Sequence, residues 1–303
     1  MSKFLDASGL TRLWNRIKTY VDNSTRGMIP IIPEAGCHNG IVRCKDITSY
    51  YTDGSLWDRI NGTNGYELFE DLFLGDYFTT GSATINFHST NTSTTSTDTR
   101  VRWWQIGGFD WRNGVGSSTE LNMHNLTIIP CAEGGQQTSV LYSGKMYSST
   151  PFTAGYVGSL PGTDMLSGGL VSTSMQNIFG SHLVKTSELL TTGNNSSGYN
   201  RYGTNSGCSS DWDWKDCYGV LLSEVECYGS IVWSSSGYDG GMDSRGQLPL
   251  FRLKPSLIST KSHILRLRSV TNYGIFTYVY RYGSAYGDNA ESYGGFRPRF
   301  IIS

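Results

Sequence analysis

The C-terminal segment constrains the fold of this chain most. Two runs rich in branched and aromatic residues, 264–270 (ILRLRSV) and 296–302 (FRPRFII), are predicted to be strands. The residues between positions 271 and 294 include six Tyr, four Gly, two Ser and two Asn. Tyr offers a wide, rigid contact area at low entropic cost, and Ser, Gly and Asn add adaptable polar contacts. This composition fits a binding surface, and it also fits a Tyr-rich hairpin with no binding role.

The order of residues within this segment follows a recognisable cassette. Leu267-Arg268-Ser269-Val270 is followed by Val279, Gly283, Ala285 and Ala290, and then by Gly295-Phe296-Arg297-Pro298. This arrangement resembles the C-terminal variable cassette in the target proteins of diversity-generating retroelements. In that family the cassette closes a C-type-lectin-like domain, related to the formylglycine-generating-enzyme fold. Many members are phage tail proteins that bind host receptors, so the resemblance implies a role in host attachment.

The free positions of the cassette agree with the way that this family varies. The family diversifies adenines, typically in Asn codons, so that Asn positions change to Tyr, Ser, Asp, Gly or Arg. The free positions here hold only residues of that set: Tyr280, Arg281, Tyr282, Ser284, Tyr286, Gly287, Asp288 and Asn289. Two positions depart from the family pattern. Phe296 stands where Val is usual, and Glu291, which adenine changes do not produce from Asn, stands where a small polar residue is usual.

The sequence also indicates where strand regularity ends. Regular alternation would place Tyr280 and Tyr282 on one side of a strand and Arg281 on the other. The resemblance implies instead three free positions in a row. Gly283 and Gly287 permit a turn or bulge that exposes successive side chains. We therefore expect regularity to end after Val279.

Two other segments rich in Gly, Ser and aromatic residues, 194–216 and 233–247, are predicted to be long loops. Loops of this length inside a compact domain are usually functional or disordered. We interpret them as rims of the same binding face. The expected ligand-binding residues are Asn272, Tyr273, Tyr278, Tyr280, Arg281, Tyr282, Ser284, Tyr286, Gly287, Asp288, Asn289, Ser292 and Tyr293, flanked by Trp212, Trp214, Trp233 and Tyr238.

The N-terminal part predicts a separate element. Residues 4–22 form an amphipathic pattern in which apolar residues recur at three- and four-residue spacing, at Leu10, Leu13, Trp14, Ile17 and Val21. An isolated helix of this length is marginal in water, so we expect its apolar stripe to be buried by self-association or by another tail or virion protein. The resemblance implies a homo-oligomer, with a trimer as the expected state. The expected domains are 1–27 as an oligomerisation or attachment helix, 28–62 as an extended connector, and 63–303 as the ligand-binding domain with its cassette at 264–303.

The remaining segments predict an α+β fold of the C-type-lectin-like kind, with short antiparallel strands and long loops. Residues 88–99 are expected to be a polar loop between two strands, 166–179 a helix, and 187–192 either a helix or a strand. Residues 218–225 resemble a strand of the family.

Composition limits the partners and the compartment. The chain has 24 basic and 25 acidic residues, so bulk attraction to nucleic acid or to anionic membranes is not expected. The sequence has neither a signal-peptide pattern nor an apolar run long enough for membrane insertion. Synthesis in a bacterial cytoplasm is therefore expected, and the resemblance implies a final place in the virion, in the phage tail. The six cysteines are expected to be free thiols, the alternative being a Cys208–Cys217 or Cys217–Cys227 bridge.

No sequence motif for catalysis stands out. The GxSxG, Walker, HExxH and GxGxxG patterns are missing, and no cysteine follows Cys227 to supply the chemistry of the formylglycine-generating enzymes. We therefore expect no catalytic residue, no metal and no cofactor, and a host cell-surface protein or glycan as the ligand. The alternative is a carbohydrate-cleaving tail protein that uses two loop carboxylates. The candidates for that pair are Asp211, Asp213, Asp216, Asp239 and Asp243.

Overall fold

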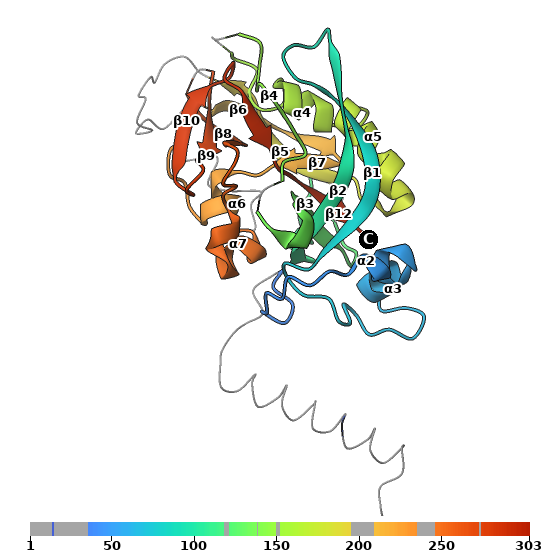
Figure 1. The fold of residues 1–303 in the computed structure, drawn as a ribbon. Helices are drawn as coiled ribbons and strands as arrows, with labels where there is room; N and C mark the ends of the chain where they lie inside the picture. The colour runs from blue at the N-terminus through green and yellow to red at the C-terminus, as the bar shows by residue number, and fades with distance from the viewer. Residues whose placement is uncertain are drawn as a thin grey trace, which may run out of the picture. The chain divides into compact units, whose positions relative to one another are not determined.

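The structure of the chain is a computed structural model, which describes Trp14 and residues 36–117, 121–137, 139–149, 152–194, 209–234, 246–272 and 274–303. The chain divides into two units, Met1–Glu34 and Ala35–Ser303. All the helices and strands labelled in Figure 1 belong to the second unit. Except for Trp14, the helix expected over 4–22 lies outside the described residues, as does the part of the expected connector before residue 36.

The second unit is mixed α+β, and its strands form two five-stranded sheets and one two-stranded sheet. Neighbouring strands are antiparallel, except that β8 and β11 are parallel. The first sheet has the order β1 (Tyr77–His88), β2 (Thr95–Phe109), β3 (Leu126–Cys131), β12 (Pro298–Ile302) and β7 (Gly219–Leu221). The second has the order β10 (Ala285–Asn289), β9 (Ile275–Val279), β8 (Leu265–Asn272), β11 (Gly294–Phe296) and β4 (Tyr142–Gly144). The third pairs β5 (Thr186–Asn194) with β6 (Ser209–Cys217).

The helices are short, and several of them cover the first sheet. Figure 1 shows α4 and α5 beside β1, and α2 at its start. Helix α5 begins later than residue 166 because Gly168 has a φ of 88° and Gly169 is still extended. The described helices are α2 (Thr48–Thr52), α3 (Ser55–Asn61), α4 (Leu160–Met165), α5 (Leu170–Phe179), α6 (Glu224–Tyr228) and α7 (Pro249–Leu253), with the 3-10 turns η1 (Glu133–Gly135), η2 (Gly180–His182) and η3 (Pro255–Leu257).

The last strand of the chain runs through the core. Trp104 of β2 is fully buried, and its ring centroid lies 5.8 Å from that of Phe300 on β12 and 5.4 Å from that of Phe179 on α5. Burial of a large apolar side chain contributes about 1.5–3 kcal/mol. β12 pairs with β3 on one side and with β7 on the other. The end of the cassette is therefore part of the scaffold.

The single strand expected over 296–302 is wrong in one respect. β11 ends at Phe296 in the second sheet, and β12 begins at Pro298 in the first. The buried Arg297 connects them, and its guanidinium donates to the carbonyls of Pro130 at 2.9 Å and Leu257 at 2.7 Å. Because Pro has no N–H to donate, it is suited to the start of a strand.

The extended connector expected over 28–62 is also corrected. Residues 48–52 and 55–61 are helical, and Ile47, Leu56 and Ile60 are fully buried in the core. Gly54 and Gly62 have left-handed backbones, and they bound α3 on either side. The folded unit therefore starts near Ala35 and not near residue 63.

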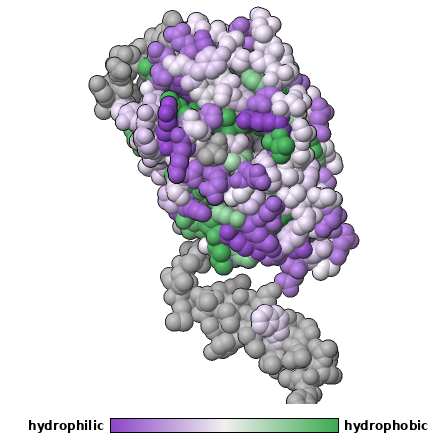
Figure 2. Space-filling view, in the orientation of Figure 1, coloured by the Kyte–Doolittle hydropathy of each residue, from purple (hydrophilic) through white to green (hydrophobic). Residues whose placement is uncertain are grey.

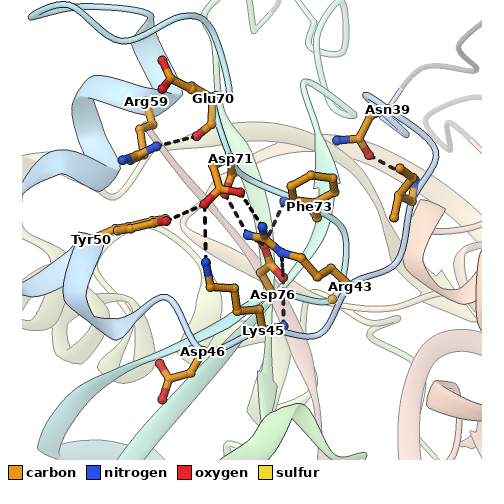
Figure 3. Close-up of polar contacts among 12 residues, drawn as sticks. Asn39, Arg43, Lys45, Asp46, Tyr50, Arg59, Glu70, Asp71, Phe73 and Asp76 are labelled. Atoms are coloured by element: carbon orange, nitrogen blue, oxygen red, sulfur yellow. Dashed lines mark hydrogen bonds and ion pairs between the residues drawn. The ribbon is translucent and has the colours of Figure 1, made fainter.

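Polar contacts attach this early segment to the rest of the unit (Figure 3). Arg43 donates through Nε and Nη2 to the two carboxylate oxygens of the buried Asp76, at 3.1 and 2.7 Å. A second carboxylate, Asp71, contacts Arg43 and accepts a hydrogen bond from the hydroxyl of Tyr50 at 2.5 Å. Figure 3 shows these side chains converging on one point between the segment and the start of β1. An extended linker makes no such convergent contacts.

Two expectations about the middle of the chain are corrected as well. Part of the loop expected over 194–216 is β6, where Trp212 and Trp214 alternate with more exposed Asp residues. The strand expected over 218–225 is only β7, and α6 begins at Glu224. The reason is a capping box: the hydroxyl of Ser223 accepts from the amide of Glu226, whose carboxylate accepts from the amide of Ser223.

A buried network of Arg and Glu side chains lies where these elements meet. Arg299 of β12 donates to both carboxylate oxygens of Glu188 at 2.9 Å and to Glu226 at 3.1 Å. Arg112 also contacts Glu188, and Arg268 of β8 lies 3.4 Å from Glu226. Burial alone raises the pKa of Glu188, but the charges of Arg112 and Arg299 offset this effect and bring the pKa to about 2. Both carboxylates therefore remain ionised inside the protein.

The described cysteines are free thiols, as expected: Cys37, Cys44, Cys131, Cys217 and Cys227. Burial raises the pKa values of Cys131 and Cys217 to about 12. Cys208 lies outside the described residues. Within the described part of the chain, none of the helices has the length and apolar character needed to cross a bilayer. Figure 2 shows hydrophilic and apolar residues interspersed over the visible face.

Candidate functional site

The centre of the expected site is a β-hairpin. β9 and β10 pair from Val279↔Ala285 to Ile275↔Asn289. The turn between them is closed by hydrogen bonds from the amide of Tyr280 to the carbonyl of Ser284 and from the amide of Gly283 to the carbonyl of Tyr280, each 2.8 Å long. Gly283 has a φ of 93°, which side-chain-bearing residues rarely adopt. The expected end of regularity after Val279 is confirmed, and Arg281, Tyr282 and Ser284 are exposed at the tip.

Five aromatic side chains form a continuous row on this hairpin and the loop beside it. The ring of Tyr286 stacks with those of Trp233 and Tyr278, with centroids 6.1 and 5.8 Å apart and interplanar angles of 19° and 23°. Tyr280 lies edge-on to Tyr286 at 5.9 Å and to Tyr282 at 5.7 Å. Tyr282 is 87% exposed and Tyr286 45%. We call Trp233, Tyr278, Tyr280, Tyr282 and Tyr286 the aromatic ridge.

The pairing of the strands explains most of the aromatic ridge. Tyr286 lies directly opposite Tyr278 across β10 and β9, so their side chains stand next to each other on the same face. Residues two apart on β9 share a face, which adds Tyr280 at its end. Val279 and Ala285 form the neighbouring cross-strand pair and are buried on the core side.

A buried carboxylate, which the sequence analysis did not identify, holds the loop that carries Trp233. Glu224 is fully buried, and its carboxylate accepts from the amides of Val232 at 3.2 Å, Trp233 at 3.1 Å and Ser234 at 2.9 Å. Its own amide donates to the hydroxyl of Ser269 on β8 at 3.0 Å. The loop at 232–234 is therefore built on α6 and the constant part of the cassette. The signal in the sequence was Ser223-x-x-Glu226, the capping box that starts α6.

The remaining cassette positions that were expected to bind ligand differ in how exposed their side chains are. Asn289 and Tyr293 are exposed, and Ser292 is half-buried. Asp288 is half-buried, and its carboxylate lies 3.2 Å from a guanidinium nitrogen of Arg266. Asn272 ends β8, but its side chain is not described, and Tyr273 lies outside the described residues.

Gly287 has less freedom than the resemblance implies. A Cβ atom at this position would lie 3.2 Å from Cγ2 of Ile275 and 3.2 Å from Oγ1 of Thr271. A larger residue therefore requires both neighbours to shift. We expect position 287 to contribute its backbone to the surface and to tolerate few other residues.

The two tryptophans expected on the first rim lie on strand β6. Trp212 and Trp214 are half-buried on β6, which pairs with β5 in the separate two-stranded sheet. β6 is not part of the cassette sheet, but it contacts β8 of that sheet. That both tryptophans flank the binding face stays a prediction. Tyr238 of the second rim lies outside the described residues.

Three of the loop carboxylates named for the catalytic alternative, Asp211, Asp213 and Asp216, lie on β6. Asp213 and Asp216 occupy odd and even positions of β6, so they point to opposite faces of the strand. Asp213 lies 2.5 Å from Nζ of Lys215, and Asp216 lies 2.8 Å from Nζ of Lys185. Asp211 is exposed at the start of β6, whereas Asp239 and Asp243 lie outside the described residues.

The aromatic ridge presents neutral polar groups. Burial raises the pKa of Tyr278, and the carboxylate of Asp288 adds to this effect. The hydroxyl of Tyr278 therefore stays protonated at physiological pH and is able to donate or accept a hydrogen bond. Such a face is suited to a ligand that offers apolar area together with hydroxyl, amide or carbonyl groups.

A cleft of about 600 Å³ lies between α2, α3, β1 and η2. Figure 1 shows α2 and α3 at the opposite end of the unit from β10. The residues that line the cleft, such as Trp57, Thr80 and His182, all lie outside the cassette. None of the residues of the aromatic ridge lines this cleft. Comparison of the chain with protein-family models, with curated proteins and with solved structures found no match.

Proposed function

We propose that the protein is a receptor-binding protein of a phage or prophage tail appendage, and that the aromatic ridge contacts a protein or glycan on the host cell. The observation that best supports this proposal is the difference in burial between constant and free positions of the cassette. The constant residues Val270, Val279, Ala285, Ala290 and Phe296 are buried, whereas the free positions Arg281, Tyr282, Ser284, Tyr286 and Asn289 are exposed. Variation at the exposed positions changes the surface and leaves the core intact.

The chemistry of the aromatic ridge supports binding. Contiguous exposed aromatic side chains on a protein surface mark interaction sites. Tyr, Trp and Arg account for most binding hot spots, and all three occur at the hairpin, as Tyr282, Trp233 and Arg281. We assign the α+β unit to the C-type-lectin-like class on the strength of the cassette, with the hairpin as its ligand-binding part.

The same proposal implies how the protein is attached to the phage tail. The unit from Ala35 onward displays the aromatic ridge, and residues 1–34 attach it to other tail proteins and to further copies of the chain, with a trimer as the expected assembly. The protein acts in the virion, without a cofactor and without catalysis. Asp213 and Asp216 point to opposite faces of β6, so these two carboxylates do not form the facing pair that sugar cleavage needs.

The test is binding of the labelled, full-length protein to a panel of bacterial strains, measured by flow cytometry. We expect saturable binding to at least one strain. Replacing Tyr282 or Tyr286 by Ala weakens that binding by about 30-fold or more, because truncation of a hot-spot residue costs roughly 2 kcal/mol.

The matched control is Val101→Ala, which removes another exposed apolar side chain, 53% accessible, from β2. We expect this variant to bind as the original protein does. Unchanged binding of both Tyr variants to a strain that binds the protein contradicts the proposal. Release of reducing sugars from that strain favours the carbohydrate-cleaving alternative.

A further inference from the structure

Arg266 is a buried cation that lies under the exposed part of the cassette. It precedes Leu267-Arg268-Ser269-Val270 on β8, and it lies opposite Tyr278 of β9. Its side chain is 0% exposed. Burial lowers the pKa of its guanidinium, so this cation requires partners to remain inside the protein.

Most partners of Arg266 are main-chain oxygens. Nη2 donates to the carbonyl of Ser292 at 2.8 Å and to that of Asn289 at 3.3 Å, and Nη1 lies 3.4 Å from the carbonyl of Asp288. The one carboxylate among these partners is that of Asp288, at 3.2 Å and 40% exposed. A planar guanidinium with donors in a fixed fork is suited to several acceptors at once.

The absence of a side chain at Gly294 leaves room for this arrangement. A Cβ atom at Gly294 would lie 2.7 Å from Cγ of Arg266 and 3.0 Å from its Nε. A side chain at position 294 therefore displaces Arg266. The glycine is needed here because of close approach, and not because of an unusual φ.

The amide of Asn289 donates to the carboxylate of Asp288 at 2.8 Å, so one bond within the segment does use a free-position side chain. Three other contacts use main-chain oxygens. The carbonyl of Ala290 accepts from the amide of Tyr147 at 2.9 Å, and the amide of Ala290 donates to the carbonyl of Gly274 at 2.7 Å. The carbonyl of Ala285 accepts from the indole of Trp233 at 2.6 Å. None of these three bonds uses a side chain at a free position of the cassette.

We propose that Arg266 is a positioning residue that fixes the path of residues 288–292 through their carbonyl oxygens, so that the shape of this segment does not depend on its side chains. This inference deepens the proposed function and rests on it for its biological meaning. Because every amino acid supplies the same carbonyl oxygen, the backbone of this segment keeps one conformation when its side chains vary. Arg266 itself contacts no ligand.

The test is amide hydrogen exchange of the full-length protein, followed by mass spectrometry of peptides that cover 285–295. One variant combines Asp288→Ala, Asn289→Ala, Ser292→Ala and Tyr293→Ala, which truncates these side chains and keeps the carbonyls. We expect its protection to stay within about threefold of the original protein. Arg266→Met lowers the protection of the same peptides by about tenfold or more, while peptides of β1 and β2 keep theirs.

Arg281→Met is the matched control, because it removes an exposed guanidinium from the same hairpin. We expect it to leave exchange at 285–295 unchanged. Arg266→Lys keeps the positive charge but loses the planar, forked set of N–H donors. We expect its protection to lie between that of the original protein and that of Arg266→Met. Gly294→Ala, which displaces Arg266 without removing it, resembles Arg266→Met.

The proposal is overturned if the combined side-chain variant loses protection as Arg266→Met does. It is also overturned if Arg266→Met leaves exchange at 285–295 unchanged. Should Arg266→Met unfold the whole unit, Gly294→Ala and the combined variant decide between these outcomes. Since the measurement needs no ligand, its failure is distinct from a failure of receptor binding.

Discussion

The indole N–H of Trp233 donates to the carbonyl oxygen of Ala285 at 2.6 Å, and the ring of the same tryptophan stacks on Tyr286, with centroids 6.1 Å apart. One side chain from a neighbouring loop thus contacts both the backbone and a displayed side chain of the hairpin. The hydrogen bond is independent of what occupies position 286, whereas the stacking is not. The loop and the hairpin are therefore coupled through two separable contacts.

Trp233→Phe separates these contacts. Phe keeps an aromatic face beside Tyr286 but has no N–H to donate to Ala285. We expect a loss of about 1 kcal/mol in unfolding free energy, the usual net value of one hydrogen bond, and faster amide exchange at 285–287. Urea denaturation and exchange mass spectrometry measure the two effects. Val232→Ala, a change at the exposed neighbour, serves as the control and is expected to alter neither quantity.

Glu224→Gln tests the support of the loop. The carboxylate accepts hydrogen bonds from the amides of residues 232–234, and a neutral amide oxygen accepts them less strongly. We expect a loss of about 1–3 kcal/mol in unfolding free energy and increased exchange at 231–234. Glu291→Gln, at an exposed position of the cassette, is the matched control. Equal effects of the two changes would show that Glu224 does not order the loop.

The stability of the cassette is expected to depend on its buried and not on its exposed residues. Leu267→Ala removes a side chain that is 2% exposed, so it costs about 2–5 kcal/mol of unfolding free energy. Tyr282→Ala removes one that is 87% exposed, so the change stays within about 0.5 kcal/mol. Urea denaturation compares the two variants. Similar losses in both contradict the division between scaffold and display.

Acid stability depends on the buried Arg–Glu network. The pKa of Glu188 is lowered from 4.5 to about 2, so its ionised form stabilises the folded state above pH 4.5 and this contribution is lost as the pH falls towards 2. We expect the unfolding free energy to decline through that window. Glu188→Gln has no carboxylate to titrate, so its decline is shallower, although the variant is less stable at neutral pH. Denaturant unfolding between pH 7 and pH 2.5 measures both slopes, and parallel slopes contradict the assignment.

The local chemistry of the hairpin was legible in the sequence. Gly283 and the run of free positions predicted a turn after Val279, and the buried residues Leu267 and Val270 lie on the strand predicted over 264–270. Contacts between segments that are distant in the sequence could not be predicted. Glu224 meets Trp233 only because a capping box turns the chain into α6, and Arg266 meets the carbonyl of Ser292 only after β8, β9 and β10 have paired. Main-chain acceptors leave no pattern in the side chains, so a sequence does not reveal them.

The error in the connector had a different cause. Residues 48–61 form two short helices, and the glycines that bound α3, Gly54 and Gly62, are also typical of turns in an irregular segment. Short helices gain most of their stability from tertiary packing, here of Leu56 and Ile60 in the core, which local composition does not record. The separate sheet position of Trp212 and Trp214 was missed for the same reason, because strand pairing over a long interval decides it.

The last prediction concerns residues 1–34, which precede the folded unit. The pattern over 4–22 carries an apolar stripe, and self-association buries such a stripe in water. A chain that begins at Ala35 keeps Leu56 and Ile60 of the core, so it is the proper truncation, whereas one that begins near residue 62 removes them. We expect light scattering to give the mass of a monomer for the shortened chain and a multiple of that mass for the full chain. Circular dichroism and thermal unfolding show whether the shortened chain is folded. If it is folded and its assembly state equals that of the full chain, the contacts between copies lie in the unit from Ala35 onward and not in the N-terminal segment.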